Sequence, residues 1–301
     1  MRAPLFLKPG DTVGIVAPAG KISRESIDQA MDVIRSWGLH VVLGKNILSP
    51  AHSYFSGSDS ERLADLQEML DRSDIHTVFC ARGGYGLTRI LDRVNFSKFL
   101  QQPKWIVGFS DITALHLKLQ QLGVESIHGP MLLHLFKSEY NESAQRLKKM
   151  LFGEVEPIKV QANAMNRWGE AKGEMIGGNL SLIVDSLGTK TSPDTQNKIL
   201  VIEEIGEYKY KIDRMFTQLK RSGKLDHLAA LIIGHMTDIK DADPGFGESI
   251  EAIVLDKIKD HHYPVAFNFP MGHEAPNMAW RHGSQGSLIV SEAESVLRFN
   301  A

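Results

Sequence analysis

The sequence predicts an α/β protein, with an N-terminal, mainly parallel sheet flanked by helices and a second, mixed α/β domain. Three observations support this. The first half alternates short apolar runs with segments of helical periodicity, which is typical of a parallel sheet covered on both faces. A polar stretch of weak periodicity follows, and the length of 301 residues suits two medium domains. We expect domains at 1–153 and 173–301, joined by a linker at 154–172.

The first domain is expected to begin with the apolar strand Thr12–Ala17. Ser23 then offers an N-cap to a helix that ends at Gly38. A further helix begins at Ile112 and ends at Gly123. The other elements predicted in this domain are strands at His40–Leu43, His76–Cys80 and Trp105–Phe109, and helices at Glu61–Leu70 and Glu142–Leu151.

The second domain has a weaker pattern, in which strands and helices follow one another less regularly. Its predicted helices are Leu180–Leu187, Ile212–Lys220 and Glu248–Lys259, and its predicted strands are Ile199–Glu203, Ala229–Gly234, Val265–Phe267 and Ser287–Val290.

Composition excludes several classes of protein. Lys+Arg 34 against Asp+Glu 36 gives a formal net charge of −2, so no basic excess favours a nucleic acid. The one cysteine, Cys80, excludes an internal disulfide framework and a Cys-rich zinc site, and it is expected to pack in the core. No apolar stretch approaches the roughly 20 residues of a membrane span, and the N-terminal apolar stretch is too short for a signal peptide. These observations predict a soluble, cytoplasmic protein.

Two loops at the carboxyl ends of predicted strands are candidates for chemistry, because ligands gather there in open α/β sheets. The first is the run Arg82-Gly83-Gly84-Tyr85-Gly86. Its glycines would let an anion approach the backbone N–H groups closely, although a tight strand-to-helix turn explains the same residues and is favoured from this motif alone. The spacing matches neither a dinucleotide fingerprint nor a P-loop.

The second loop is Gly108-Phe109-Ser110-Asp111. A serine between strand and helix resembles a nucleophile elbow, with the Asp111 N–H placed for an oxyanion. Ser and Asp are also the preferred N-caps before a helix, and a simple N-cap role for Ser110 is favoured from these residues alone.

A serine nucleophile needs a base and an acid that orients it. Among twelve histidines, His235 and His273 are the best placed, each in a loop after an apolar strand, whereas His116 is expected at the surface. Glu203 is the better acid, since a carboxylate on a buried strand is costly unless it is paired. Glu204 and Glu207 are expected to be ordinary loop acids.

Metal and cofactor sites are not predicted. Asp238, Asp241 and Asp243 resemble a calcium loop, but Pro244 and a missing final glutamate break its spacing. We therefore expect no metal and no cofactor.

In the order and spacing of its motifs, the chain resembles the LD-carboxypeptidases. This is a serine peptidase family that includes muramoyl-tetrapeptide carboxypeptidase and the microcin C self-immunity proteins. The resemblance covers nearly the whole chain. The motifs that carry it are Leu7–Asp11, Ala17–Gly20, Arg82–Gly86, Gly108–Thr113, His128–Met131, Gly177–Leu180, Glu203–Arg214 and Gly272-His273.

The resemblance implies a catalytic triad of Ser110 as nucleophile, His273 as general base and Glu203 as the acid that orients it. It also implies an oxyanion hole made by the backbone of Asp111, Gly83 and Gly84. The substrate would be a cell-wall tetrapeptide that loses its terminal D-alanine during peptidoglycan recycling, and the protein would be a homodimer.

Two positions concern the substrate. Arg82 is a candidate partner for the terminal carboxylate of the substrate. Glu274 stands where family members commonly carry glycine, so its carboxylate beside His273 is expected to affect the base or the choice of substrate.

Two alternatives remain open. A self-immunity type of peptidase would cleave an amide between an amino acid and a nucleotide-like group, and it would need Trp168 or Trp280 for stacking. A non-catalytic, two-domain binding protein would use the glycine loop and the start of the Ser110 helix only to hold an anion.

Overall fold

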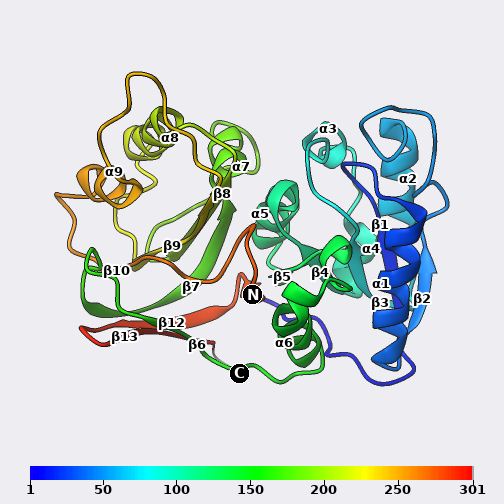
Figure 1. Cartoon of the computed structure of the whole chain (residues 1–301). Helices are drawn as coiled ribbons and strands as arrows, with labels where there is room; N and C mark the ends of the chain where they lie inside the picture. Colours follow the sequence, from blue (N-terminus) through cyan, green and yellow to red (C-terminus); the bar gives the residue numbers. More distant parts are fainter. Residues whose placement is uncertain (300–301) are drawn as a thin grey trace. The chain divides into compact units, whose positions relative to one another are not determined.

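The computed structural model describes residues 1–299, and the chain divides into two compact units. Unit 1 comprises Met1–Val155 and Ala275–His282, whereas unit 2 comprises Glu156–Glu274 and the chain from Gly283 onward. The expected α/β fold class is confirmed in both (Figure 1). The stretch 154–172, expected as a linker, contains one strand and the start of another, and the segment Ala275–His282 of the expected second domain belongs to unit 1.

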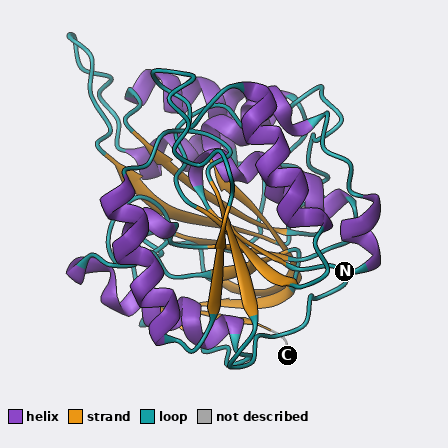
Figure 2. Ribbon diagram, turned by 90° about the vertical axis from the view of Figure 1, so that its right-hand side faces the viewer, coloured by secondary structure: helices purple, strands orange, loops and turns teal. Residues whose placement is uncertain are grey.

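Unit 1 is built on a six-stranded sheet of order β11-β5-β4-β3-β1-β2, within the described residues. All neighbours are parallel except β11, which runs antiparallel to β5. The sheet twists, and helices lie on both sides of it (Figure 2). The strands are β1 Thr12–Val16, β2 His40–Leu43, β3 Ile75–Cys80, β4 Trp105–Gly108, β5 Ser126–His128 and β11 Trp280–His282.

Two of the helices of unit 1, α1 and α2, begin at residues whose side chains cap them. Ser23 caps α1 by accepting the N–H of Ser26, as expected, and Ser58 and Glu61 form a reciprocal capping box at the start of α2. The apolar face of α1 packs in the core with Val13, Ile15 and Phe79 of the sheet. The helices are α1 Arg24–Ser36, α2 Asp59–Asp71, α3 Thr88–Leu91, α4 Ser97–Gln101, α5 Thr113–Gln121 and α6 Asn141–Leu151, with 3₁₀ turns η1 Ser110–Ile112, η2 Leu132–His134 and η3 Ser138–Tyr140.

Unit 2 contains a seven-stranded mixed sheet of order β10-β9-β8-β7-β12-β13-β6 in the described part of the chain. The long strand β7 joins its two halves, because it pairs parallel with β8 and antiparallel with β12. The strands are β6 Ile158–Gln161, β7 Gly169–Asn179, β8 Ile199–Ile205, β9 Ala230–Thr237, β10 Val265–Ala266, β12 Gln285–Val290 and β13 Glu294–Phe299.

Three helices cover the parallel half of this sheet. They are α7 Leu180–Asp185, α8 Lys209–Arg221 and α9 Ile250–Lys257. Their buried side chains, among them Ile183, Phe216 and Val254, form one apolar core with β8 and β9. The parallel strands are therefore buried and apolar, and their carboxyl ends carry the polar residues of interest.

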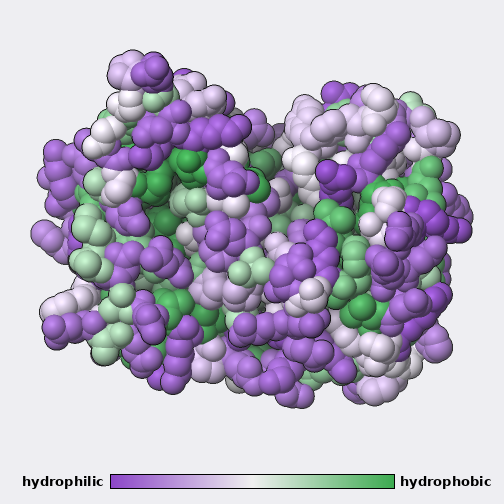
Figure 3. Space-filling model, in the orientation of Figure 1, coloured by the Kyte–Doolittle hydropathy of each residue, from purple (hydrophilic) through white to green (hydrophobic). Residues whose placement is uncertain are grey.

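On the face shown in Figure 3, hydrophilic residues predominate, and hydrophobic residues form separate patches. None of the helices in residues 1–299 is long and apolar enough to cross a lipid bilayer.

Candidate active site

Ser110 lies directly after β4 in a strained turn. Its φ of 62° is in the left-handed region, which a residue with a Cβ adopts at a cost of about 1–3 kcal/mol. The N-cap interpretation is wrong, since the Ser110 side chain caps neither η1 nor α5. The half-buried hydroxyl makes no hydrogen bond within unit 1. The strained backbone therefore orients the Ser110 hydroxyl for another role, since the side chain does not cap a helix.

The glycine loop packs against this serine. A Cβ added to Gly83 would lie 3.1 Å from the Ser110 Cβ and 3.2 Å from its Oγ. Gly83 is buried, Gly84 has a φ of 104°, and neither amide N–H donates a hydrogen bond in residues 1–299. Buried amides are nearly always paired, so the Gly83 N–H beside a serine hydroxyl is suited to an incoming oxygen.

Two side chains hold the glycine loop in place. The buried Asp111 carboxylate accepts the N–H of Leu87 at 2.9 Å, which ties the loop to the serine turn. The buried Arg62 donates to the carbonyl oxygens of Gly86, at 2.9 Å, and of Pro18. These contacts pre-organise the loop, and neither was predicted from sequence because each joins distant segments.

Replacement of Gly83 by alanine is expected to lower the activity of the protein by up to about 10-fold, since the added Cβ would displace Ser110 by a few tenths of an ångström and a displacement of about 1 Å costs roughly 100-fold. The new methyl group would press on Ser110, while the fold should stay intact because Gly83 has no positive φ. Steady-state turnover measures the loss, and the melting temperature checks the fold. The control is Gly245→Ala, where the nearest atom to the added Cβ is 3.6 Å away. Equal activity of the two variants would contradict this packing.

His116 is buried, not at the surface as expected from sequence. Its Nε2 lies 2.9 Å from the Gly108 carbonyl oxygen and its Nδ1 lies 2.7 Å from the Ser126 Oγ. A carbonyl only accepts, so Nε2 carries the proton and Nδ1 accepts from the serine. Burial lowers the pKa of His116 to about 4, so the ring stays neutral near pH 7. It therefore supports the end of β4, two residues before Ser110, and carries no charge there.

In unit 2, His273 and Glu203 form a hydrogen-bonded pair. The His273 Nδ1 lies 2.7 Å from Oε2 of Glu203, whose side chain is fully buried. A carboxylate only accepts, so the Nδ1–H of His273 donates to Glu203, and in the neutral form of the ring the lone pair is on the other nitrogen, Nε2. A neutral imidazole held in this way is suited to act as a general base.

Two irregular backbone segments determine the orientation of the Glu203 and His273 side chains. The pairing of β8 with β9 shifts register between Ile202 and Glu204, and such bulges re-aim side chains next to active sites. Gly272, with a φ of 130°, passes so close that an added Cβ would lie 3.0 Å from both Cβ and Oε2 of Glu203. A side chain at this position would push His273 away from its acid.

The other unit 2 candidates have different surroundings. Glu204 is buried and accepts hydrogen bonds from the Asn179 amide, the Ser181 N–H and hydroxyl and the Ile205 N–H, so it is not the loop acid predicted. Burial raises the pKa of Glu204. His235 is half-buried, and its Nδ1 accepts the Glu274 N–H at 3.3 Å. Burial lowers the pKa of His235, which makes it a poor cation.

The remaining sequence candidates lie in unit 1. Arg82 is exposed, and its Nη1 donates to the Lys21 carbonyl oxygen at 2.9 Å. Cys80 is fully buried as expected, and burial raises its thiol pKa far above the usual range, so it cannot serve as a thiolate. Trp280 is fully buried beneath His128, so the expectation that it could stack on a nucleotide is wrong.

Across residues 1–299, no three His, Cys, Asp or Glu side chains are grouped as a metal site requires.

The chain matches two family models in sequence. Residues 13–129 match the LD-carboxypeptidase N-terminal domain, and residues 172–288 match the LD-carboxypeptidase C-terminal domain. The chain is 36% identical to a probable murein peptide carboxypeptidase of Bacillus subtilis, over 98% of this chain and 93% of that protein. It is 29% identical to a murein tetrapeptide carboxypeptidase of Pseudomonas aeruginosa, over 92% of each chain.

Solved structures share the fold. A muramoyltetrapeptide carboxypeptidase from Oxalobacter formigenes superposes with a TM-score of 0.87 at 27% identity, covering 96% of this chain and 99% of that one. An MccF-like protein from Bacillus anthracis gives the same TM-score at 22% identity, with both chains fully covered, and this likeness concerns the fold alone.

Proposed function

Because the chain belongs to the LD-carboxypeptidase family, we propose that it is a serine-type peptidase that releases the terminal D-alanine of a murein tetrapeptide. The observation that carries this proposal is the His273–Glu203 pair, in which Oε2 of a buried carboxylate lies 2.7 Å from Nδ1 of the imidazole. Relatives named as murein peptide and tetrapeptide carboxypeptidases support the substrate class.

The proposed reaction begins when the Ser110 hydroxyl attacks the carbonyl before the terminal residue. His273 Nε2 takes the hydroxyl proton, and Glu203 stabilises the imidazolium that forms. The Asp111, Gly83 and Gly84 N–H groups stabilise the negative oxygen of the tetrahedral intermediate, with the buried Gly83 N–H as the best-supported donor.

The second half of the reaction regenerates the enzyme. His273 returns the proton to the departing nitrogen, so free D-alanine leaves and an acyl ester remains on Ser110. Water then attacks this ester, with His273 again as base, and the shortened peptide leaves as a carboxylic acid. His273 takes up and returns every proton in this sequence of steps, and none of the steps uses a metal or a cofactor.

The alternative substrate is an amide that joins an amino acid to a nucleotide-like group. Trp168 supports it, because 61% of this side chain is exposed on the loop before β7, where a base could stack. A structure of MccF in complex with glutamyl sulfamoyl guanosine shares the fold. Its sequence is only 20% identical to this chain, so the likeness concerns the fold and not the substrate.

A side-by-side assay tests the proposal. The purified protein should release D-alanine from murein tetrapeptide, detected with D-amino-acid oxidase, and should leave glutamyl sulfamoyl guanosine intact when that reaction is followed by mass spectrometry. Cleavage of the sulfamoyl nucleoside without D-alanine release would replace the murein substrate by the alternative.

A further inference from the structure

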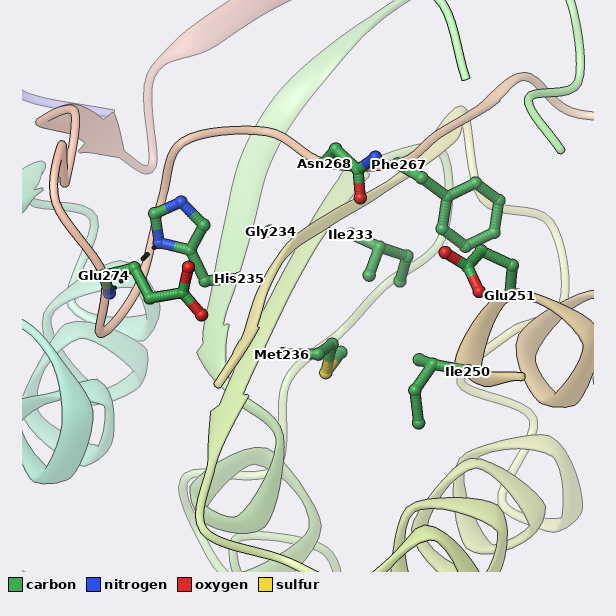
Figure 4. Close-up of a pocket in the computed structure, with 9 residues that line it drawn as sticks. All are labelled: Ile233, Gly234, His235, Met236, Ile250, Glu251, Phe267, Asn268 and Glu274. Carbon is green, nitrogen blue, oxygen red and sulfur yellow. Dashed lines mark hydrogen bonds between the residues drawn. The ribbon is translucent and has the colours of Figure 1, made fainter. Parts of the chain in front are cut away.

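A peptidase that removes the last residue of a chain needs a group that binds the free carboxylate at the end of the substrate. The pocket beside His273 in unit 2 is unsuited to this task. Figure 4 shows Glu274 at one end of the pocket and Glu251 at the other. Neither carboxylate makes an ion pair within residues 1–299. Two like charges would repel a terminal carboxylate, so the group that binds it is expected elsewhere.

In unit 1, the side chain of Tyr54 lies against the glycine loop. A Cβ added to Gly84 would lie 3.3 Å from the Tyr54 Oη. Within the described part of the chain, this hydroxyl makes no hydrogen bond, and the residue is 52% exposed. Its O–H is therefore available to donate to a substrate that lies along the loop.

The surrounding chain holds Tyr54 in this position. Its N–H donates to Nδ1 of His52 at 3.0 Å, and its carbonyl oxygen accepts the N–H of Lys21 at 3.2 Å. Its ring packs edge-on against the buried Phe55, with the two ring centroids 5.1 Å apart. None of these contacts uses the hydroxyl, so a phenylalanine at this position would keep them all.

The spacing between Ser110 and this hydroxyl matches the end of a peptide. A Cβ added to Gly83 would lie 3.2 Å from the Ser110 Oγ, and the Tyr54 Oη lies beside the next residue of the loop, Gly84. In a substrate, the terminal carboxylate likewise stands one residue beyond the carbonyl that the serine attacks, a step of about 3.5 Å. A substrate with its scissile carbonyl at Gly83 and its chain running toward Gly84 thus brings its carboxylate to Tyr54.

The charges beside Tyr54 favour an anion. Neither Arg82 nor Lys21 makes an ion pair in residues 1–299, and the Arg82 Nη1 is held by the Lys21 carbonyl oxygen at 2.9 Å. Gly20 links this arginine to the Tyr54 hydroxyl, since its own Cβ position is 3.6 Å from the Arg82 Nε and its Cα is 3.9 Å from the Cβ position of Gly84. A hydroxyl donor near an uncompensated cation suits a carboxylate better than a neutral carboxamide.

We propose that Tyr54 selects substrates with a free terminal carboxylate, its hydroxyl donating a hydrogen bond to that carboxylate while Arg82 supplies a compensating charge. The proposal rests on the function proposed above. Because the carboxylate belongs to the residue that leaves, the contact lasts until D-alanine departs. Tyr54 is thus a specificity-determining residue, and it takes no proton from the reacting groups.

Two forms of one murein tetrapeptide test the proposal, the first with the free carboxylate of D-alanine and the second with a carboxamide in its place. The kcat/KM of each is measured by mass spectrometry of the shortened peptide, the product common to both. We expect the unmodified protein to favour the acid by more than about tenfold. Tyr54→Phe should lower the value for the acid about tenfold and change that for the carboxamide by less than about twofold, as the loss of one half-exposed hydrogen bond to a charge predicts.

The control is Tyr210→Phe, which removes the hydroxyl of an exposed tyrosine of α8 in unit 2 and should alter neither value by more than about twofold. The melting temperature of Tyr54→Phe should not fall. The dissociation constants of both peptides are also measured calorimetrically on Ser110→Ala, with and without Tyr54→Phe, and should show the same preference and the same loss.

Equal values for the acid and the carboxamide, or a preference that survives Tyr54→Phe, would overturn the assignment of Tyr54 while D-alanine release still supported the proposed function. A preference for the acid in binding that depends on Tyr54, without any turnover by the unmodified protein, would support the assignment and contradict the proposed function instead.

Discussion

Replacement of Ser110 by alanine is expected to lower D-alanine release by at least about 10⁴-fold, the scale found when a serine nucleophile is removed. The loss should appear in kcat, because the hydroxyl forms a bond only during the reaction. Substrate affinity should change little, and the melting temperature should not fall, since the hydroxyl makes no hydrogen bond within its own unit.

The control for this variant is Ser97→Ala, an exposed serine at the start of α4 in the same unit. It should retain full activity. Full turnover by Ser110→Ala would remove Ser110 from the mechanism and would leave its left-handed backbone without a catalytic explanation.

Replacement of Glu203 by glutamine is expected to lower kcat by about 10³-fold at an unchanged KM. The amide keeps the size of the side chain but cannot stabilise the imidazolium, and an amide N–H facing Nδ1 would favour the wrong tautomer. The effect should be smaller than that of Ser110→Ala, because a serine with an unassisted base retains some reactivity.

Glu207→Gln is the matched control, because Glu207 lies four residues further on and pairs with Lys211 outside the His273 pair. Its kcat should stay within about twofold of the unmodified protein, since half-exposed ion pairs contribute little. A kcat for Glu203→Gln equal to that of Glu207→Gln would show that the buried pair does not act in the reaction.

The sequence predicted the strands that contain a continuous apolar run. Thr12–Val16 and Ile199–Ile205 are buried on both faces of their sheets, so their runs of Val, Ile and Leu are sufficient evidence. β7 was missed because its four glycines and three charged residues obscure a strand that pairs with two different neighbours. β5 and β11 have three residues each, which is too short for any periodicity.

The candidate site was predictable only in part for a related reason. The apolar strand before Glu203 indicated an acid that needs a partner, but the partner His273 lies 70 residues away and no local pattern joins them. The prediction that Ser110 caps a helix was wrong, because helix caps and nucleophile turns contain the same residue types. His116 was misplaced because the Gly108 carbonyl and the Ser126 hydroxyl that satisfy it come from neighbouring strands.

Labelling with a fluorophosphonate tests directly whether Ser110 is a nucleophile activated by His273. We expect a single adduct, mapped by mass spectrometry to the peptide that contains Ser110, whose rate of formation falls at least about 100-fold in His273→Ala. A protein that releases D-alanine but is labelled elsewhere, or labelled at Ser110 equally fast without His273, would contradict it. Neither label nor turnover, with ligand still bound, would identify a binding protein instead.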